Sequence, residues 1–146
     1  MSQPSQFHEP DQRTQDKFVK SWDLIVDFYD GSSMRTFLGN NLADLMVQFV
    51  KSMQSEGYNR SLRAGQVMHH LVLSRSREHG SLGRCHLSFD PEYGTYEVNG
   101  QRKTVQALRV SYRVDGRILD DFAEDDIVFT DRIRTLLQTL SAQPLE

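Results

Sequence analysis

The sequence predicts an α+β fold, in which helices cover one face of a mostly antiparallel sheet. Two observations support this class. Over 41–56 and 62–79, apolar residues recur with the 3.6-residue period of helices, whereas after Gly80 they alternate with polar residues as in half-buried strands. A helical pattern then closes the chain. We expect, in order, a short N-terminal helix, a β-hairpin, two central helices, an antiparallel meander of about four strands, and a C-terminal helix packed on one sheet face.

The chain has the length of one domain. Its 146 residues are enough to enclose a hydrophobic core. We expect a mobile N-terminal tail over 1–13, a single domain over 14–141, and a frayed C-terminus over 142–146. The tail is rich in Gln, Ser, Pro and charged residues, which bury too little apolar surface to offset the entropy lost on ordering.

The first part of the domain fits two templates. One long helix would leave Leu24 and Phe28 outside its apolar stripe. A strand would instead place Leu24 and Phe28 on one side and both acids, Asp23 and Asp27, on the other. We favour a helix that ends near residue 20, followed by a hairpin with strands at 22–29 and 34–38, and keep the long helix as the alternative.

Two further helices are expected in the middle of the chain. The cleaner pattern spans 41–56 and ends at Gly57. The second helix is expected near 62–79, because Gly80 suits the left-handed position just past a helix end. Its face follows the i, i+3, i+4, i+7, i+8 spacing in Ala64, Val67, Met68, Leu71 and Val72. A strand through 67–75 is the alternative.

The meander begins after these helices. Alternating residues predict a half-buried strand at 84–90, ended by a turn that starts at 90–92. A second strand around 96–98 leads into Asn99-Gly100. That dipeptide is typical of a type I′ hairpin turn, which needs positive φ at both central residues.

The end of the chain continues the meander and adds a helix. A long strand is expected at about 103–114 with a bulge near 107–108, and Asp115-Gly116 forms the turn into a last strand at 117–120. Thr130 can cap the closing helix. Its apolar face contains Phe129, Ile133, Leu136, Leu137 and Leu140.

Charge is spread unevenly along the chain. The formal net charge is −3, which argues against general binding to polyanions. Residues 59–88 contain five arginines and one glutamate, whereas 115–131 contain seven acids and one arginine. Opposite patches of this kind can face each other within one molecule or meet a charged partner, where they mainly set orientation and association rate.

Cysteine content and the N-terminus indicate a compartment. Cys85 is the single cysteine, so the chain cannot form an internal disulfide, which is typical of a reducing environment. The first residues lack the basic and apolar regions of a signal peptide. No apolar run approaches the ~20 residues that a membrane span needs. We therefore expect a soluble cytoplasmic protein.

Five potential zinc ligands lie close together in sequence: His69, His70, His79, Cys85 and His86. A helix over 62–79 would, however, separate the adjacent His69 and His70 by about 100°. Cys85 and His86 would point to opposite faces of a strand. The chain also contains neither a Gly-x-Ser-x-Gly elbow nor a phosphate-binding loop. We predict no metal site, no cofactor and no catalytic residue.

We interpret the chain as a non-enzymatic protein-binding module, such as an adaptor, an assembly chaperone or a regulator. The predicted contacts are Arg75, Arg77 and Arg113 for charge, and Phe37 and Leu38 as apolar side chains. The expected partner is another protein with an acidic surface; no membrane contact is expected, and a homo-oligomer is left open. Two alternatives are kept: a nucleic-acid-binding module that uses the same arginines, and an enzyme with a pocket that the sequence does not reveal.

Overall fold

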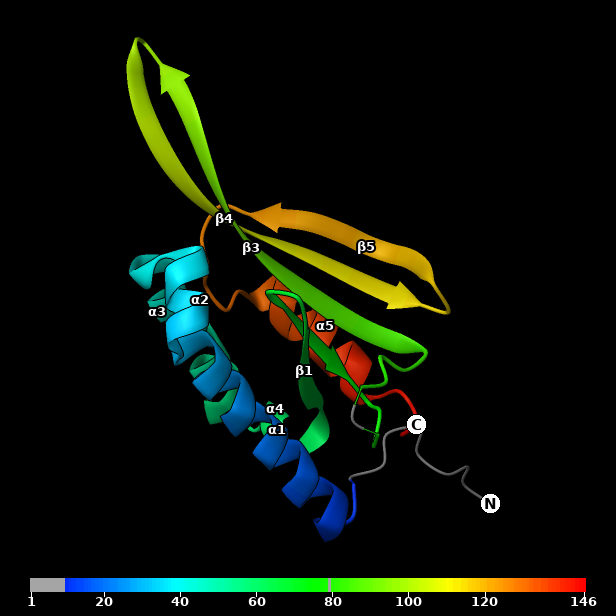
Figure 1. Cartoon of the computed structure of the whole chain (residues 1–146). Helices are drawn as coiled ribbons and strands as arrows, with labels where there is room; N and C mark the ends of the chain where they lie inside the picture. Colours follow the sequence, from blue (N-terminus) through cyan, green and yellow to red (C-terminus); the bar gives the residue numbers. More distant parts are fainter. Residues whose placement is uncertain (1–9, 79) are drawn as a thin grey trace.

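The computed structural model of the chain describes residues 10–78 and 80–146 (Figure 1). In this part of the chain the helices are α1 (Gln12–Asp30), α2 (Ser32–Leu38), α3 (Asn40–Ser55), α4 (Tyr58–Ser61) and α5 (Asp131–Ser141). The strands are β1 (Arg63–Val67), β2 (His70–Ser74), β3 (Cys85–Val98), β4 (Gln101–Val114) and β5 (Arg117–Glu124). The predicted α+β class is confirmed.

The five strands form one antiparallel sheet in the order β1-β2-β3-β4-β5, so each strand pairs with its neighbour in sequence. Helix α5 contacts β3, as predicted for the closing helix, and α1 contacts β1. In Figure 1, α5 runs behind the strands, while α1 and α3 stand together on one side of them. The core fills the space between the sheet and these helices, with Trp22, Phe49, Phe89 and Leu137 almost fully buried.

The hairpin predicted at 22–38 is wrong, because α1 runs unbroken to Asp30 and α2 follows at once. Asp11 begins α1 by accepting a hydrogen bond from the N–H of Thr14 at 2.8 Å. The helical stripe then supplies the core, where the indole of Trp22 donates to the carbonyl of Leu62 at 2.8 Å. Burial of that stripe stabilises the long helix over the hairpin, although the helix leaves other apolar side chains of α1 outside the core.

The helix predicted near 62–79 is also wrong. The segment forms the β1–β2 hairpin, with Met68 in the left-handed region at φ 56° in the two-residue turn. Strand β2 then pairs with β3, setting Leu73 opposite Leu87 in the core. The apolar spacing fits both periods over this short run, and the pairing with a distant strand selects the extended form. The strand kept as the alternative at 67–75 is the better description.

The meander departs from the prediction at two points. Strand β3 passes through Pro91, opposite Leu108, where a turn was expected at 90–92. A proline is tolerated there because β2 pairs with β3 only up to Phe89, which leaves an open edge beyond. The pairing is also continuous at 107–108, and the irregularity lies instead between Tyr112 and Arg113, opposite β5.

The turns predicted at 99–100 and 115–116 and the cap predicted at Thr130 are confirmed. Asn99 and Gly100 have φ of 53° and 77°, so they form the turn between the two longest strands. Figure 1 shows the far half of this β3–β4 hairpin projecting beyond the body of the molecule. Asp115 lies at φ 51°, and the Thr130 hydroxyl accepts a hydrogen bond from the N–H of Ile133 at 3.3 Å, which starts α5.

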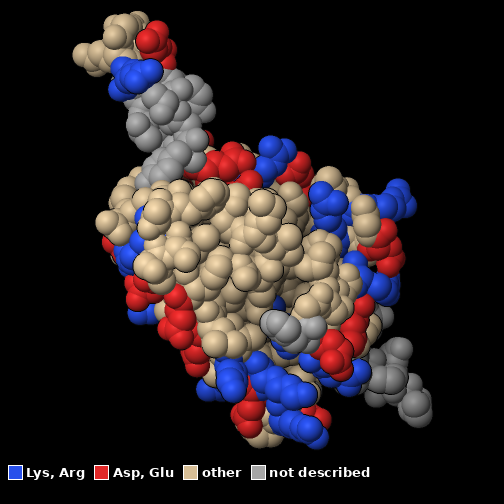
Figure 2. Space-filling model, viewed as in Figure 1, with Lys and Arg blue, Asp and Glu red and all other residues tan. Residues whose placement is uncertain are grey.

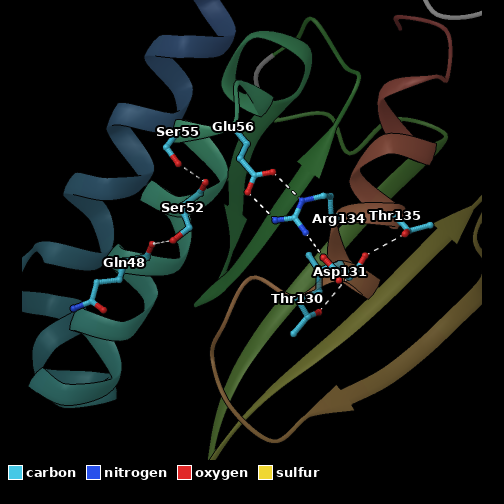
Figure 3. Close-up of polar contacts among 9 residues, drawn as sticks. Gln48, Ser52, Ser55, Glu56, Thr130, Asp131, Arg134 and Thr135 are labelled. Atoms are coloured by element: carbon cyan, nitrogen blue, oxygen red, sulfur yellow. Dashed lines mark hydrogen bonds and ion pairs between the residues drawn. The ribbon is translucent and has the colours of Figure 1, made fainter.

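A charged contact joins α3 to α5 (Figure 3). The guanidinium of Arg134 binds both carboxylate oxygens of Glu56 at 2.8 Å and also pairs with Asp131 in the first turn of its own helix. Two parallel N–H···O bonds of this kind fix the relative orientation of the groups. The contact therefore sets the end of α3 against the start of α5.

The two chain ends complete the fold. The tail predicted over 1–13 falls mostly outside the described residues, and α1 already begins at Gln12. Near the other end, the N–H of Glu146 donates to the carbonyl of Arg75 at 3.0 Å, and the N–H of Arg77 donates to that of Glu146 at 2.8 Å. The last residues thus lie beside 75–77. Among the described helices, none combines the length and apolar character that a membrane crossing requires.

Candidate functional site

The two predicted apolar contacts lie in different surroundings. Phe37 is 64% exposed on α2, and its ring centroid lies 5.1 Å from that of His69. Leu38 is buried in the core. Neighbouring residues of a helix point in directions about 100° apart, so Phe37 and Leu38 meet different surroundings on α2. Phe37 alone remains at the surface.

The three predicted charged contacts also differ. Arg75 is fully buried, and its guanidinium donates to the carbonyls of Gln143 at 2.9 Å and Ser61 at 2.6 Å. These bonds hold the C-terminal segment and the end of α4, so the side chain of Arg75 lies inside the molecule rather than at its surface. Arg77 is exposed beside the C-terminal residues, and Arg113 is half-buried on β4.

Part of the separated charge is matched within the molecule. Arg84 binds both carboxylate oxygens of Asp115 at 2.8 and 3.0 Å, and Arg109 binds Asp121 at 3.0 Å. Hydrogen bonding to these arginines lowers the pKa of Asp115 and of Asp121. Arg84 and Arg109 are therefore engaged in ion pairs within the molecule, and Arg75, one of the arginines expected to bind nucleic acid, is buried.

The structure forms a groove between α1 and the hairpin β1–β2. Its volume is about 540 Å³, within the range of ligand-binding clefts. One wall comes from α1, the floor comes from the outer face of β1 and β2, and the segment 80–82 closes the far side. The apolar lining includes Leu24, Phe28, Val67, Val72 and Leu82.

The groove is open because small residues lie in its floor and large ones stand at its rim. A Cβ placed on Gly65 would meet nothing within 4 Å, so the space above this residue is empty. Leu24 is 58% exposed, and Val67 and Leu82 are also exposed at the rim. A cluster of exposed apolar side chains around a hollow is typical of a binding surface.

The edge of the sheet also borders the groove. Strand β1 has a strand neighbour on one side only, and α1 lies along the other side. There the N–H of Ala64 donates to the hydroxyl of Ser21 at 2.9 Å, and Ser21 in turn donates to the carbonyl of Phe18 at 2.6 Å. Backbone groups alternate in direction along an antiparallel strand, so those of Gln66 face away from β2 as well.

A basic depression continues the groove toward the start of α1. It is shallower, at about 300 Å³, and shares Ser21, Leu24 and Arg63 with the groove. Its other lining residues are Lys17, Lys20, Arg77 and one acid, Glu78. Figure 2 shows the same division as a broad uncharged surface with Lys and Arg atoms gathered below it. We call the two parts the apolar groove and the basic depression.

The sequence contained one signal for the apolar groove. Leu24 and Phe28 are the apolar residues that do not fit the helical stripe of α1, and both line the groove. A side chain that breaks a helical pattern while the helix forms anyway is therefore a candidate for a surface contact. Val67 and Leu82 had no such signal, because their positions depend on the β1–β2 hairpin and on the segment after it.

The histidines give one group that could hold a metal ion. The prediction that His69 and His70 diverge depended on a helix. The structure instead places His69 in the β1–β2 turn and His70 at the first position of β2. The Nε2 atoms lie 3.0 Å (His69) and 3.2 Å (His70) from Oδ1 of Asp90 on β3. Cys85 is separate and buried in the core, where burial raises the pKa of its thiol.

Comparisons with known proteins add no assignment. No family model, no curated protein and no solved structure matches this chain. The apolar groove, the basic depression and the histidine group are thus the features from which a function can be inferred.

Proposed function

We propose that this chain is a protein-binding module that takes an acidic, amphipathic segment of a partner protein along α1. The observation that carries the proposal is the continuity of the apolar groove with the basic depression through Leu24 and Arg63. An apolar hollow beside a cluster of cations complements a peptide with apolar residues at one end and carboxylates at the other.

The dimensions suit a short segment. Phe28 in the apolar groove and Lys17 in the basic depression are eleven positions apart on α1, or about 16 Å along a helix axis. About five extended residues cover that length. Each large apolar side chain that becomes fully buried in the groove contributes about 1.5–3 kcal/mol, while the carboxylates set orientation and association rate.

This placement decides which of the contact residues predicted from the sequence belong to the proposed site. Arg77 stays a charged contact, since it lines the basic depression. Arg75, Leu38 and Arg113 line neither hollow. Arg75 instead keeps the C-terminal segment in place beside Arg77.

Site-specific crosslinking tests where the partner binds. A photo-crosslinking phenylalanine derivative replaces Leu24 in one sample and Leu119 on β5 in the control, because the two side chains are equally exposed at 58% and 60%. We expect a crosslinked partner peptide at position 24 that combines apolar and acidic residues. Equal crosslinking at both positions, a basic peptide, or crosslinks to nucleic acid at position 24 would contradict the proposal.

The identified segment then allows a quantitative test as a synthetic labelled peptide. Leu24→Asp and the pair Lys17→Glu with Lys20→Glu are expected to weaken its binding at least tenfold, about 1.4 kcal/mol or more, measured by fluorescence anisotropy. Lys51→Glu on α3 changes charge outside both hollows and is the control. Binding that is equally weakened by Lys51→Glu would show a general charge effect rather than a site.

A further inference from the structure

Three metal-ligating side chains converge near the turn of the β1–β2 hairpin. His69 lies in the turn, His70 begins β2, and Asp90 lies on the neighbouring strand β3. Their ligand atoms all lie within 4.8 Å of one another. The convergence joins residues twenty positions apart in sequence, and it exists because the segment folds as a hairpin.

The spacing matches that of ligands around one ion. Zinc bonds to imidazole nitrogen and carboxylate oxygen are about 2.0–2.1 Å long, so neighbouring ligand atoms of a tetrahedral site lie about 3.3 Å apart. The two nitrogens of His69 and His70 lie 3.0 and 3.2 Å from Oδ1 of Asp90. The ligand atoms of the two histidines lie within 4.8 Å of each other, so an ion could enter with an adjustment of the side chains.

Contacts from α1 and α2 hold His69 in place. The hydroxyl of Tyr29, at the end of α1, donates to the carbonyl of His69 at 2.7 Å. The ring of Phe37 packs against the ring of His69 on another side. Ligands held by such contacts lose little freedom when an ion binds, which favours affinity.

The ligand group is also accessible. The side chains of His69, His70 and Asp90 are 21%, 36% and 23% exposed, so an ion can reach them from solvent. Partial exposure leaves room for water as a fourth ligand. Two imidazoles and one carboxylate with an open position are a donor set for zinc and related divalent ions.

We infer that His69, His70 and Asp90 form a binding site for one divalent transition-metal ion, with zinc the expected occupant. The ion would tie the tip of the β1–β2 hairpin to β3, next to Val67 in the apolar groove. The inference stands on the geometry of the three ligands and does not depend on the proposed function.

Metal titration of the full chain tests the inference. Protein without an affinity tag is stripped with EDTA, dialysed, and titrated with zinc chloride by calorimetry and with cobalt chloride by absorption. We expect one ion per chain, the visible bands of four-coordinate cobalt, and a thermal midpoint that rises with zinc because the ion binds the folded state. Absence of binding to the wild type would overturn the inference and leave a hydrogen-bonded His–Asp cluster.

Matched variants assign the ligands. Asp90→Asn and His70→Ala are expected to weaken zinc binding by at least about tenfold, since even supporting residues of metal sites cost 10–100-fold when changed. Asp121→Asn, on β5, removes a carboxylate outside the group and should leave zinc affinity unchanged. Histidine side-chain NMR of the wild type, with and without zinc, reports the ligands even if a variant fails to fold. Zinc affinity unaltered in both ligand variants, or zinc shifts confined to other histidines, would contradict the site.

Discussion

The two sides of α1 carry equally apolar residues in different surroundings. On one side, Phe18, Trp22 and Tyr29 are fully buried in the core. On the other, Leu24 is exposed and Phe28 lines the apolar groove. The apolar residues of one helix thus divide by their place around the axis, some into the core and others to the surface of a groove.

The strongest test of the buried side is Trp22→Ala. The change removes a fully buried indole and its hydrogen bond to the Leu62 carbonyl, so we expect a loss of about 3–5 kcal/mol in the free energy of unfolding. Urea denaturation followed by circular dichroism measures it. A loss below about 1 kcal/mol would show that this side of α1 contributes little to the core.

Ser21→Ala examines the boundary between the two sides. Ser21 accepts the hydrogen bond from the N–H of Ala64, so its removal leaves that buried donor unsatisfied and is expected to cost about 1–3 kcal/mol. Ser52→Ala on α3 is the matched control, because its exposed hydroxyl donates to the carbonyl of Gln48 in the same helix (Figure 3). Equal losses of unfolding free energy in the two variants would show that the hydrogen bond between α1 and β1 stabilises the fold no more than an exposed one.

Tyr29→Phe isolates one hydrogen bond at the end of the buried side. The phenol donates to the His69 carbonyl, and burial raises the pKa of Tyr29, so the hydroxyl stays protonated as a donor. We expect a loss of about 0.5–1.5 kcal/mol in unfolding free energy, because the ring itself is kept. Amide hydrogen exchange should show faster opening of the β1–β2 turn. Unchanged exchange there would show that the Tyr29 hydrogen bond does not stabilise the turn.

Elements with local signals could be predicted from the sequence. Thr130 before a regular apolar stripe predicted α5, and Asn99-Gly100 predicted the turn between β3 and β4, because a cap or a positive φ depends on a few neighbouring residues. The class of the fold followed from such elements in order. The helix predicted at 41–56 is found at Asn40–Ser55, a shift of one residue at each end.

The remaining errors have a common physical cause. Strand β2 is selected by pairing with β3, and α1 is selected by burial of its stripe against the sheet and α3; neither partner is visible in the local sequence. Burial of Arg75 follows in the same way from the position of the C-terminal segment. Residues brought together by the topology, such as His70 and Asp90, therefore could not be paired in advance.

Leu24→Ala is expected to have the smallest effect on stability and thus gives the sharpest contrast between the two sides. The side chain is 58% exposed, so its removal should change the free energy of unfolding by no more than about 0.5 kcal/mol. Trp22→Ala, on the buried side and outside both hollows, should cost about 3–5 kcal/mol. The same two proteins, tested with the crosslinked partner peptide, should reverse in order once the folded fraction is accounted for. Leu24→Ala should weaken binding more than Trp22→Ala, because Leu24 stands at the groove rim and Trp22 lines neither hollow. If both variants lost stability alike, or if Leu24→Ala left peptide binding intact, the apolar residues outside the stripe of α1 would have no separate role in recognition.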